Sequence, residues 1–188
     1  FLMKRYLDWK FSFTFINLRK RIWKNIGFAQ AGNVTTVLNN YVPYYIFSGF
    51  SPGIITALTF AQQLSVLPNS LVTNHFTSVS AIKFNELYSN RDYNRLNEVF
   101  ISTANLLIFL LMPISGLIFL YSTEIISVVF EHGRFGEGAV EDTSIFFKYL
   151  GLQLPLIAIN NLFSRLLMAG HKTPQSFAYQ ILFNVILV

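Results

Sequence analysis

Long apolar runs, separated by short polar segments, organise this chain. The clearest run, Ile101 to Tyr121, contains no Asp, Glu, Lys, Arg or His. As a helix rising 1.5 Å per residue, it is long enough to cross the roughly 30 Å hydrocarbon core of a bilayer. Further spans are expected at 26–49, 53–81, 143–169 and 174–188, the last too short to cross. The runs lack two-residue alternation, so they predict an all-α integral membrane protein, a polytopic helical bundle.

Composition supports a membrane protein. Hydrophobic residues make up 53% of the chain and charged residues 12%, against about 25% charged in a typical soluble domain. The chain begins at Phe1, and the last apolar run is cut at Val188, which suggests a piece of a longer polypeptide. The Gly, Ser and Pro residues of 47–53 predict a tight turn between antiparallel helices. Gly170 is expected to end another helix in the left-handed conformation.

Positive charges are distributed unevenly between the predicted loops. Eleven of the 14 Lys and Arg residues fall on one side of the spans: Lys4, Arg5, Lys10, Arg19, Lys20, Arg21, Lys24, Lys83, Arg91, Arg95 and Lys172. The opposite side has Arg134 and five acids, so the positive-inside rule places the first side in the cytoplasm. The net charge of +5 is therefore a topology signal, and no nucleic-acid partner is expected. Residues 1–25 form either a cytoplasmic basic linker or an interfacial segment on anionic lipid.

Polar residues within the spans form stripes on helix faces, because many are spaced three or four residues apart. Together the stripes predict a wet cavity shared by three helices, with hydrogen bonding between packed helices as the alternative. Two cations of the fourth span, Lys148 and Arg165, face this cavity or extend to the membrane surface. The candidate cavity residues are Asn33, Asn40, Gln62, Gln63, Asn69, Lys148, Gln153, Asn160 and Arg165.

Prolines and glycines predict irregular backbone. Each complete span contains one proline, and such helices are commonly kinked: Pro43, Pro68, Pro113 and Pro155. A brief interfacial helix is expected at 124–130, breaking at Gly133, Gly136 and Gly138. Glu141 and Asp142 are then expected in the first turn of the next span, where acids are favourable.

Enzyme signatures are missing from the sequence. The chain has no Cys, and its three His residues are isolated from one another without metal-ligand spacing. Its nine acids fall in the predicted loops or at span ends. These features favour a protein that is not an enzyme and has no resident cofactor.

The sequence resembles the bacterial lipid II flippases of the MviN/MurJ type, from about Leu18 onward. One motif that carries the resemblance is the predicted external loop, Phe130, Glu131, His132, Gly133, Arg134 and Phe135. A second is the end of the fourth span and the turn after it, Arg165, Ala169, Gly170, Thr173 and Pro174. The segment Leu58 to Val72 is also similar to a helix of that family.

The resemblance implies a fold and a function. The chain would correspond to helices seven to eleven of a fourteen-helix transporter of the multidrug, oligosaccharidyl-lipid and polysaccharide exporter superfamily, which is most of its second lobe. Such proteins move undecaprenyl-pyrophosphate-linked peptidoglycan precursor across the bacterial inner membrane by alternating access of two lobes. The implied partners are the lipid-linked sugar, membrane lipids and cell-wall synthesis proteins.

Some residues depart from the family pattern. Gln62 and Gln63 stand where the family usually has an acid and an arginine, and Pro43 lies near an acid that binds sodium in some members. Asn184 is the candidate for a remaining sodium contact. These departures argue against ion coupling through this part of the chain, with coupling to sodium or to the membrane potential as the alternative. Alternatives are a flippase for another lipid-linked polysaccharide, such as an O-antigen or capsule unit, a drug exporter of the same fold, or a membrane enzyme or scaffold.

Overall fold

The described residues of the chain are helices joined by short connections. The computed structural model describes residues 20–50, 53–133, 135–170 and 173–187. In order these form α2 (Lys20–Phe47), α3 (Ile54–Pro68), the π-helical turn η1 (Asn69–Thr73), α4 (Asn74–Ser89), α5 (Tyr93–Phe130), α6 (Glu137–Ala169) and α7 (Thr173–Leu187). No strand occurs in these ranges, so the all-α prediction is confirmed.

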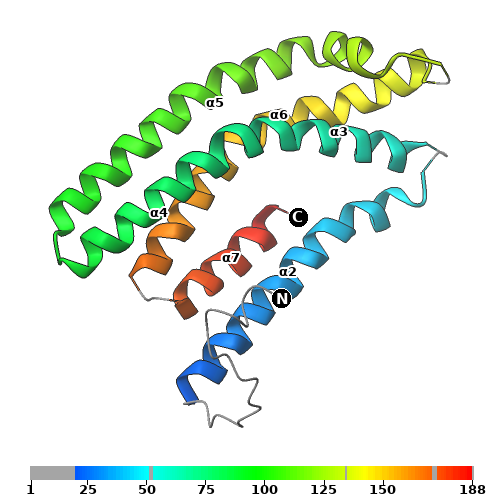
Figure 1. Cartoon of the computed structure of the whole chain (residues 1–188). Helices are drawn as coiled ribbons and strands as arrows, with labels where there is room; N and C mark the ends of the chain where they lie inside the picture. Colours follow the sequence, from blue (N-terminus) through cyan, green and yellow to red (C-terminus); the bar gives the residue numbers. More distant parts are fainter. Residues whose placement is uncertain (1–19, 51–52, 134, 171–172, 188) are drawn as a thin grey trace, which may run out of the picture.

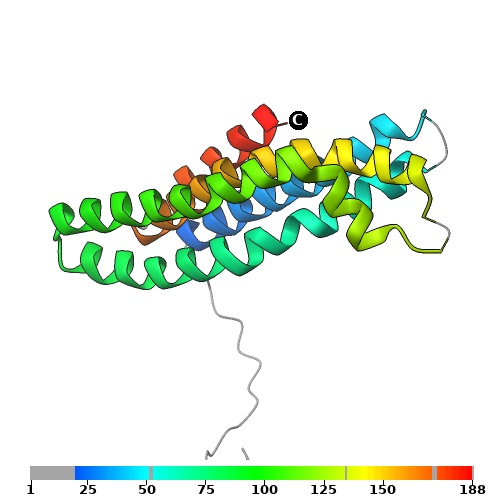
Figure 2. The ribbon, with the colours of Figure 1, turned by 90° about the horizontal axis from the view of Figure 1, so that it is seen from above.

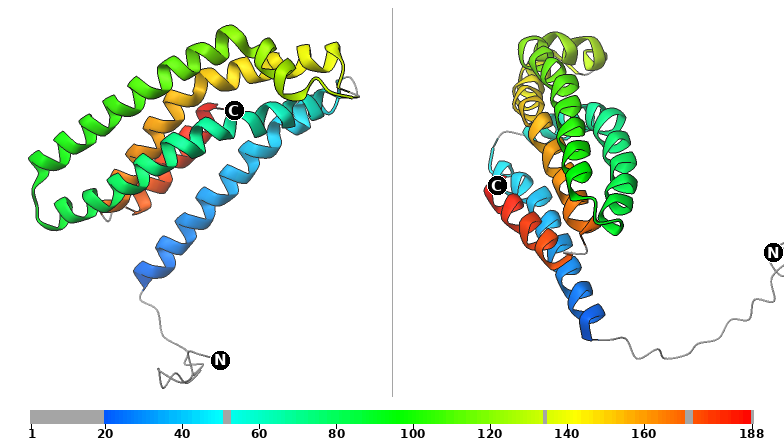
Figure 3. Two further views of the ribbon diagram at one scale, coloured as in Figure 1. Left: turned by 45° about the horizontal axis from the view of Figure 1, so that its top comes forward. Right: turned by 90° about the vertical axis from the view of Figure 1, so that its left-hand side faces the viewer.

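The helices form two groups. In one group α6 packs along α5 and against α3, and α4 packs against both α5 and α6. In the other group α2 packs along α7. The end-on view in Figure 3 shows this second pair beside the larger group. α2 and α3 run in opposite directions from their junction, as the turn composition predicted, but they diverge (Figure 1) and touch only sparsely.

The connections alternate between two ends of the bundle. The start of α2, the α4–α5 turn and the α6–α7 connection lie toward one end, and the α2–α3 and α5–α6 connections lie toward the other (Figure 1). Arg91 belongs to the first end and Glu131 to the second. This is the arrangement that the uneven distribution of Lys and Arg predicted.

Large apolar side chains cover much of the outer surface. On α5, Phe109, Leu120 and Val128 are 74%, 70% and 77% exposed. By length and composition α5 and α6 are long and apolar enough to cross a membrane. Only 22% of the most apolar stretch of α5, and 28% of that of α6, is buried. A soluble protein rarely exposes apolar surface so extensively, whereas hydrocarbon would cover it.

The interior is built where α5 crosses α6. One core cluster includes the buried side chains Phe84, Leu107 and Leu162, and a second includes Ile118 and Phe147. Gly151 of α6 lies so close to α5 that an added Cβ would sit 2.3 Å from Ile118 Cγ2. The crossing therefore depends on the absence of a side chain at this position.

The helices extend beyond the predicted spans, because a helix continues through polar residues as long as its backbone hydrogen bonds are made. α2 already includes Lys20, α4 continues to Ser89, and α5 runs from Tyr93 to Phe130. Asp92 caps α5 by accepting a hydrogen bond from the Arg95 backbone N–H at 3.1 Å.

Two expectations about the start of α6 were wrong. The helix begins at Glu137, so Glu137 occupies the first turn and Glu141 and Asp142 lie in the second. Gly138 consequently lies inside the helix and does not break it. The apolar pattern predicted the start of the membrane-spanning part of this helix, at residue 143. The backbone becomes helical one to two turns earlier, at Glu137.

The prolines lie inside helices as predicted, but the backbone irregularities do not all coincide with them. Pro68 ends α3 and is followed at once by η1; proline lacks an N–H, so the regular hydrogen-bond pattern cannot continue through it. In α5 the departure is at Tyr121, with φ −115° and ψ 25°, and not at Pro113. Figure 2 shows the final turns of α5 bending away from the rest of the helix.

Two glycines at helix ends behave differently. Gly133 has φ +66°, the left-handed conformation that favours glycine. Gly170 has φ −73° and ψ 8°, so the left-handed prediction for this residue was wrong. A Cβ on Gly170 would lie 3.3 Å from the Tyr88 ring, which indicates that close packing limits side-chain size there.

Candidate functional site

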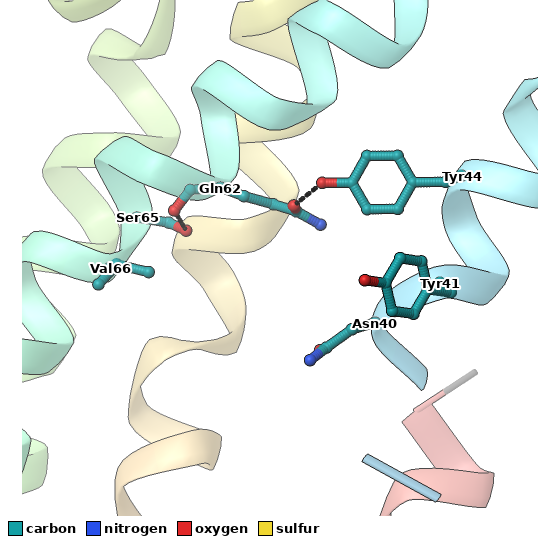
Figure 4. A pocket seen from close by; sticks show the side chains of 6 residues that line it. All are labelled: Asn40, Tyr41, Tyr44, Gln62, Ser65 and Val66. Atoms are coloured by element: carbon teal, nitrogen blue, oxygen red, sulfur yellow. Dashed lines mark hydrogen bonds between the residues drawn. The ribbon is translucent and has the colours of Figure 1, made fainter. Parts of the chain in front are cut away.

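A pocket of about 670 Å³ lies between the diverging helices α2 and α3. Its lining residues are Asn40, Tyr41 and Tyr44 from α2 and Gln62, Ser65 and Val66 from α3 (Figure 4). On α2 Tyr44 lies three and four residues after Tyr41 and Asn40, and on α3 Ser65 and Val66 lie three and four residues after Gln62, which places each set on one side of its helix. The pocket therefore results from two faces meeting across the gap between the two groups of helices.

A hydrogen bond spans the pocket. The Tyr44 hydroxyl donates to Gln62 Oε1 at 2.8 Å (Figure 4). The rings of Tyr41 and Tyr44 lie 6.4 Å apart between centroids and are tilted by 50°. Ser65 Oγ donates to the Gln62 carbonyl at 2.9 Å, so its proton is already used within α3.

Polar groups that remain available point into the same space. Figure 4 shows the Asn40 amide and the Tyr41 hydroxyl extending from α2 into the gap, and Gln62 extending toward them from α3. Each amide offers two N–H donors and an acceptor oxygen, and a tyrosine hydroxyl is both donor and acceptor. None of the six lining residues carries a charge. The pocket thus suits a ligand rich in hydroxyl and amide groups.

The structure brings together only part of the predicted cavity. Asn40 and Gln62 meet in the pocket. Gln63, next to Gln62, is exposed and does not line it, and Asn33 is exposed about two turns before Asn40 on α2. Tyr41 was missed by sequence reasoning, although its three-residue spacing from Tyr44 was a usable signal.

Further polar atoms are buried without a hydrogen-bond partner in the described structure. The side-chain oxygens of Asn69 and Asn160 are in this state, as are the hydroxyls of Thr73, Ser164 and Ser176. They belong to η1, α6 and α7. Buried polar groups are normally satisfied by protein or by ordered water, so these atoms mark polar points inside the bundle. Gln153, also on α6, is half-buried.

The two cations of α6 lie outside the pocket. Lys148 Nζ sits 4.4 Å from the centroid of the Phe119 ring, a cation–π contact between α6 and α5. Arg165 is exposed, one turn before the end of α6. Neither residue lines the space between α2 and α3.

The predicted external-loop signature contains an aromatic cluster. Phe130 and Phe135 pack on Phe60 of α3 with ring centroids 4.9 and 5.4 Å away, and on each other at 5.8 Å. Glu131 accepts a hydrogen bond from the Ser127 hydroxyl, and Gly133 supplies the left-handed turn. Arg134 lies outside the described residues. The two phenylalanines therefore hold the α5–α6 connection against α3.

Asn184 joins α7 to α2. Its Nδ2 donates to Thr36 Oγ1 at 3.2 Å and to Thr35 Oγ1 at 3.5 Å, and both threonine hydroxyls donate to the Gly32 carbonyl. This contact is a hydrogen-bonded clamp between α7 and α2. Among the described residues there is no group of three or more His, Cys, Asp or Glu side chains placed to hold a metal. The sodium contact at Asn184 stays a prediction.

Comparison with known proteins assigns the chain to a family. The family model described as lipid II flippase MurJ matches residues 1–188. No curated protein and no solved structure matches the chain. The match covers both resemblance motifs and the pocket helices. The chain, an all-α membrane protein, belongs to the lipid II flippase MurJ family.

Proposed function

We propose that this protein translocates an undecaprenyl-pyrophosphate-linked peptidoglycan precursor across the bacterial inner membrane by alternating access. The family match over the whole chain carries this proposal. In it, helices α2 to α7 belong to the second of two lobes, and the pocket between α2 and α3 is part of the polar surface that meets the substrate headgroup. Cell-wall synthesis proteins are the proposed protein partners.

The composition of the bundle supports transport over catalysis. Large apolar side chains are exposed on the outer surface of the helices, while uncharged amides and hydroxyls line the open pocket between α2 and α3. A polar headgroup crossing a bilayer needs such a polar surface, because hydrocarbon offers it no hydrogen bonds. Transport also agrees with the family, whose members are flippases.

A second candidate is a flippase for another lipid-linked polysaccharide. The observation that favours it is the uncharged pair Gln62 and Gln63, where the resemblance leads one to expect an acid and an arginine. A changed headgroup contact on this helix is compatible with a different sugar unit. Both candidates share the chemistry of a sugar carried on a polyprenyl pyrophosphate.

Complementation separates the two candidates. The full-length protein is expressed in a bacterium depleted of its lipid II flippase, and in parallel in a strain lacking its O-antigen flippase. Growth and normal cell shape in the first strain, without restored O-antigen in the second, is the expected result. Restored O-antigen without rescue of growth would contradict the peptidoglycan assignment and favour the alternative.

A further inference from the structure

We infer that the pocket between α2 and α3 binds the neutral saccharide portion of the lipid-linked substrate and leaves the pyrophosphate to be bound elsewhere. This inference deepens the proposed function and rests on it for the class of substrate. The ligand chemistry is that of an N-acetylated sugar, with hydroxyl and amide groups on a ring that has apolar faces. The argument depends on the volume of the pocket, its hydrogen-bonding groups, its aromatic rings and its lack of charge.

The volume and the lining suit a small organic group. The pocket measures about 670 Å³, inside the range of about 300–1,000 Å³ typical of small-molecule sites. Such sites combine apolar walls with a few polar groups that fix the orientation of the ligand. Here the rings of Tyr41 and Tyr44 and the Val66 side chain provide apolar surface, and the amides of Asn40 and Gln62 provide the polar groups.

The amides match the hydrogen bonds that a sugar needs. A hydroxyl both donates and accepts, and an acetamido group has one N–H donor and one acceptor oxygen. Asn40 and Gln62, on opposite walls, can pair with either kind of group. The Tyr41 hydroxyl adds a donor and acceptor beside them. Tyrosine rings present apolar faces on which the C–H surface of a sugar ring can pack.

The absence of cations argues against pyrophosphate in this pocket. Phosphate groups are recognised mainly by Arg, Lys, metal ions or converging backbone N–H groups. None of the six lining residues is basic, Lys148 contacts the Phe119 ring, and the pocket lies within helices away from their N-termini. A diphosphate placed here would therefore find no counter-charge among the lining residues.

The hydrogen bond across the pocket holds one of its walls in place. Because the Tyr44 hydroxyl is bonded to Gln62 Oε1, the amide of Gln62 is held in one orientation, and within the described residues its Nε2 is available to donate to a ligand. Tyr44 is thus a positioning residue for Gln62. A group held before the ligand arrives loses less conformational freedom on binding.

The test measures two probes on the full-length protein in nanodiscs by saturation-transfer NMR titration. The first probe is N,N′-diacetylchitobiose, an N-acetylated disaccharide without phosphate, and the second is inorganic pyrophosphate. Gln62→Leu is expected to weaken disaccharide binding about fivefold for each hydrogen bond lost, and Tyr44→Phe up to about fivefold. Pyrophosphate binding is expected to stay unchanged in both variants.

Gln63→Leu is the matched control, since it makes the same substitution at the neighbouring residue outside the pocket. It should bind both probes as the unmodified protein does. The inference is overturned if the unmodified protein does not bind the disaccharide, if Gln62→Leu binds it unchanged, if Gln62→Leu and Gln63→Leu weaken it equally, or if pyrophosphate binding falls in parallel.

These outcomes are separate from a failure of the proposed function. If the protein rescues the depleted strain but Gln62→Leu does not change disaccharide binding, the saccharide site is contradicted and the flippase function is supported. Disaccharide binding that depends on Gln62, without rescue of that strain, keeps the site and assigns the protein to another lipid-linked sugar.

Discussion

The crossing of α5 and α6 permits a quantitative prediction at Gly151. In Gly151→Ala the new Cβ would lie 2.3 Å from Ile118 Cγ2 and 2.9 Å from Ile118 Cβ. Carbon atoms in contact are normally about 3.5–4.0 Å apart, so the shortest of these distances is more than 1 Å too small. Ile118 is buried in a core cluster and has little room to move away. The substitution must therefore separate the helices or force a strained rotamer.

The expected cost follows from these contacts. Adding a methyl group to a well-packed core typically costs about 1–3 kcal/mol. Replacing glycine by alanine inside a helix returns about 0.5–1 kcal/mol through backbone entropy. Because the overlap includes Ile118 Cβ, which a change of rotamer does not displace, we expect a net destabilisation of about 1–2 kcal/mol.

The assay is equilibrium unfolding of the purified full-length protein in mild detergent. Gly116→Ala on α5 is the matched control, because a Cβ there meets no atom within 4 Å and should leave stability unchanged or slightly raised. Ile118→Ala removes the nearest clashing atom, so the double variant Gly151→Ala, Ile118→Ala should lose at least about 1 kcal/mol less than the sum of the single changes.

Two results would refute this reasoning. One is a Gly151→Ala protein as stable as Gly116→Ala, which would mean that the helices are not in close contact at this point. The other is strict additivity in the double variant, since destabilisation unrelated to Ile118 would then have to come from another part of the structure.

Three further predictions concern the Lys148 contact, the topology and the Asn184 contact. Lys148→Met should reduce stability by about 0.5–1 kcal/mol in the same unfolding assay, because it removes the cation–π contact with Phe119, and it should leave transport per folded molecule intact; a selective loss of transport would instead place Lys148 on the substrate path. In this Cys-free chain, Glu131→Cys should react with an impermeant thiol reagent outside intact spheroplasts and Arg91→Cys should not; the reverse labelling would overturn the topology. Asn184→Ala should lower stability by about 1 kcal/mol without changing the sodium dependence of transport, because its amide nitrogen faces two hydroxyls; a changed sodium response would contradict the clamp.

The sequence by itself determined the class of the protein and the direction of its helices. Hydropathy and charge act locally, since each segment has to match either hydrocarbon or water, and the distribution of Lys and Arg orients the loops. For this reason the helical spans, the alternation of connections between two ends and the family resemblance were all accessible before the structure. Helix ends such as Tyr93 and Glu137 were less accessible, because a helix can continue into water beyond its apolar part.

Tertiary structure decided which polar residues act together. Gln62 and Gln63 are alike and adjacent in the sequence, but only Gln62 lines the pocket, and Lys148 contacts Phe119 instead of a cavity. Adjacent residues of a helix point about 100° apart, so the outcome depends on how each helix is rotated and where it crosses its neighbours. That rotation is set by contacts between residues distant in the sequence, such as Gly151 with Ile118, and a pattern of single residues along the chain does not contain them.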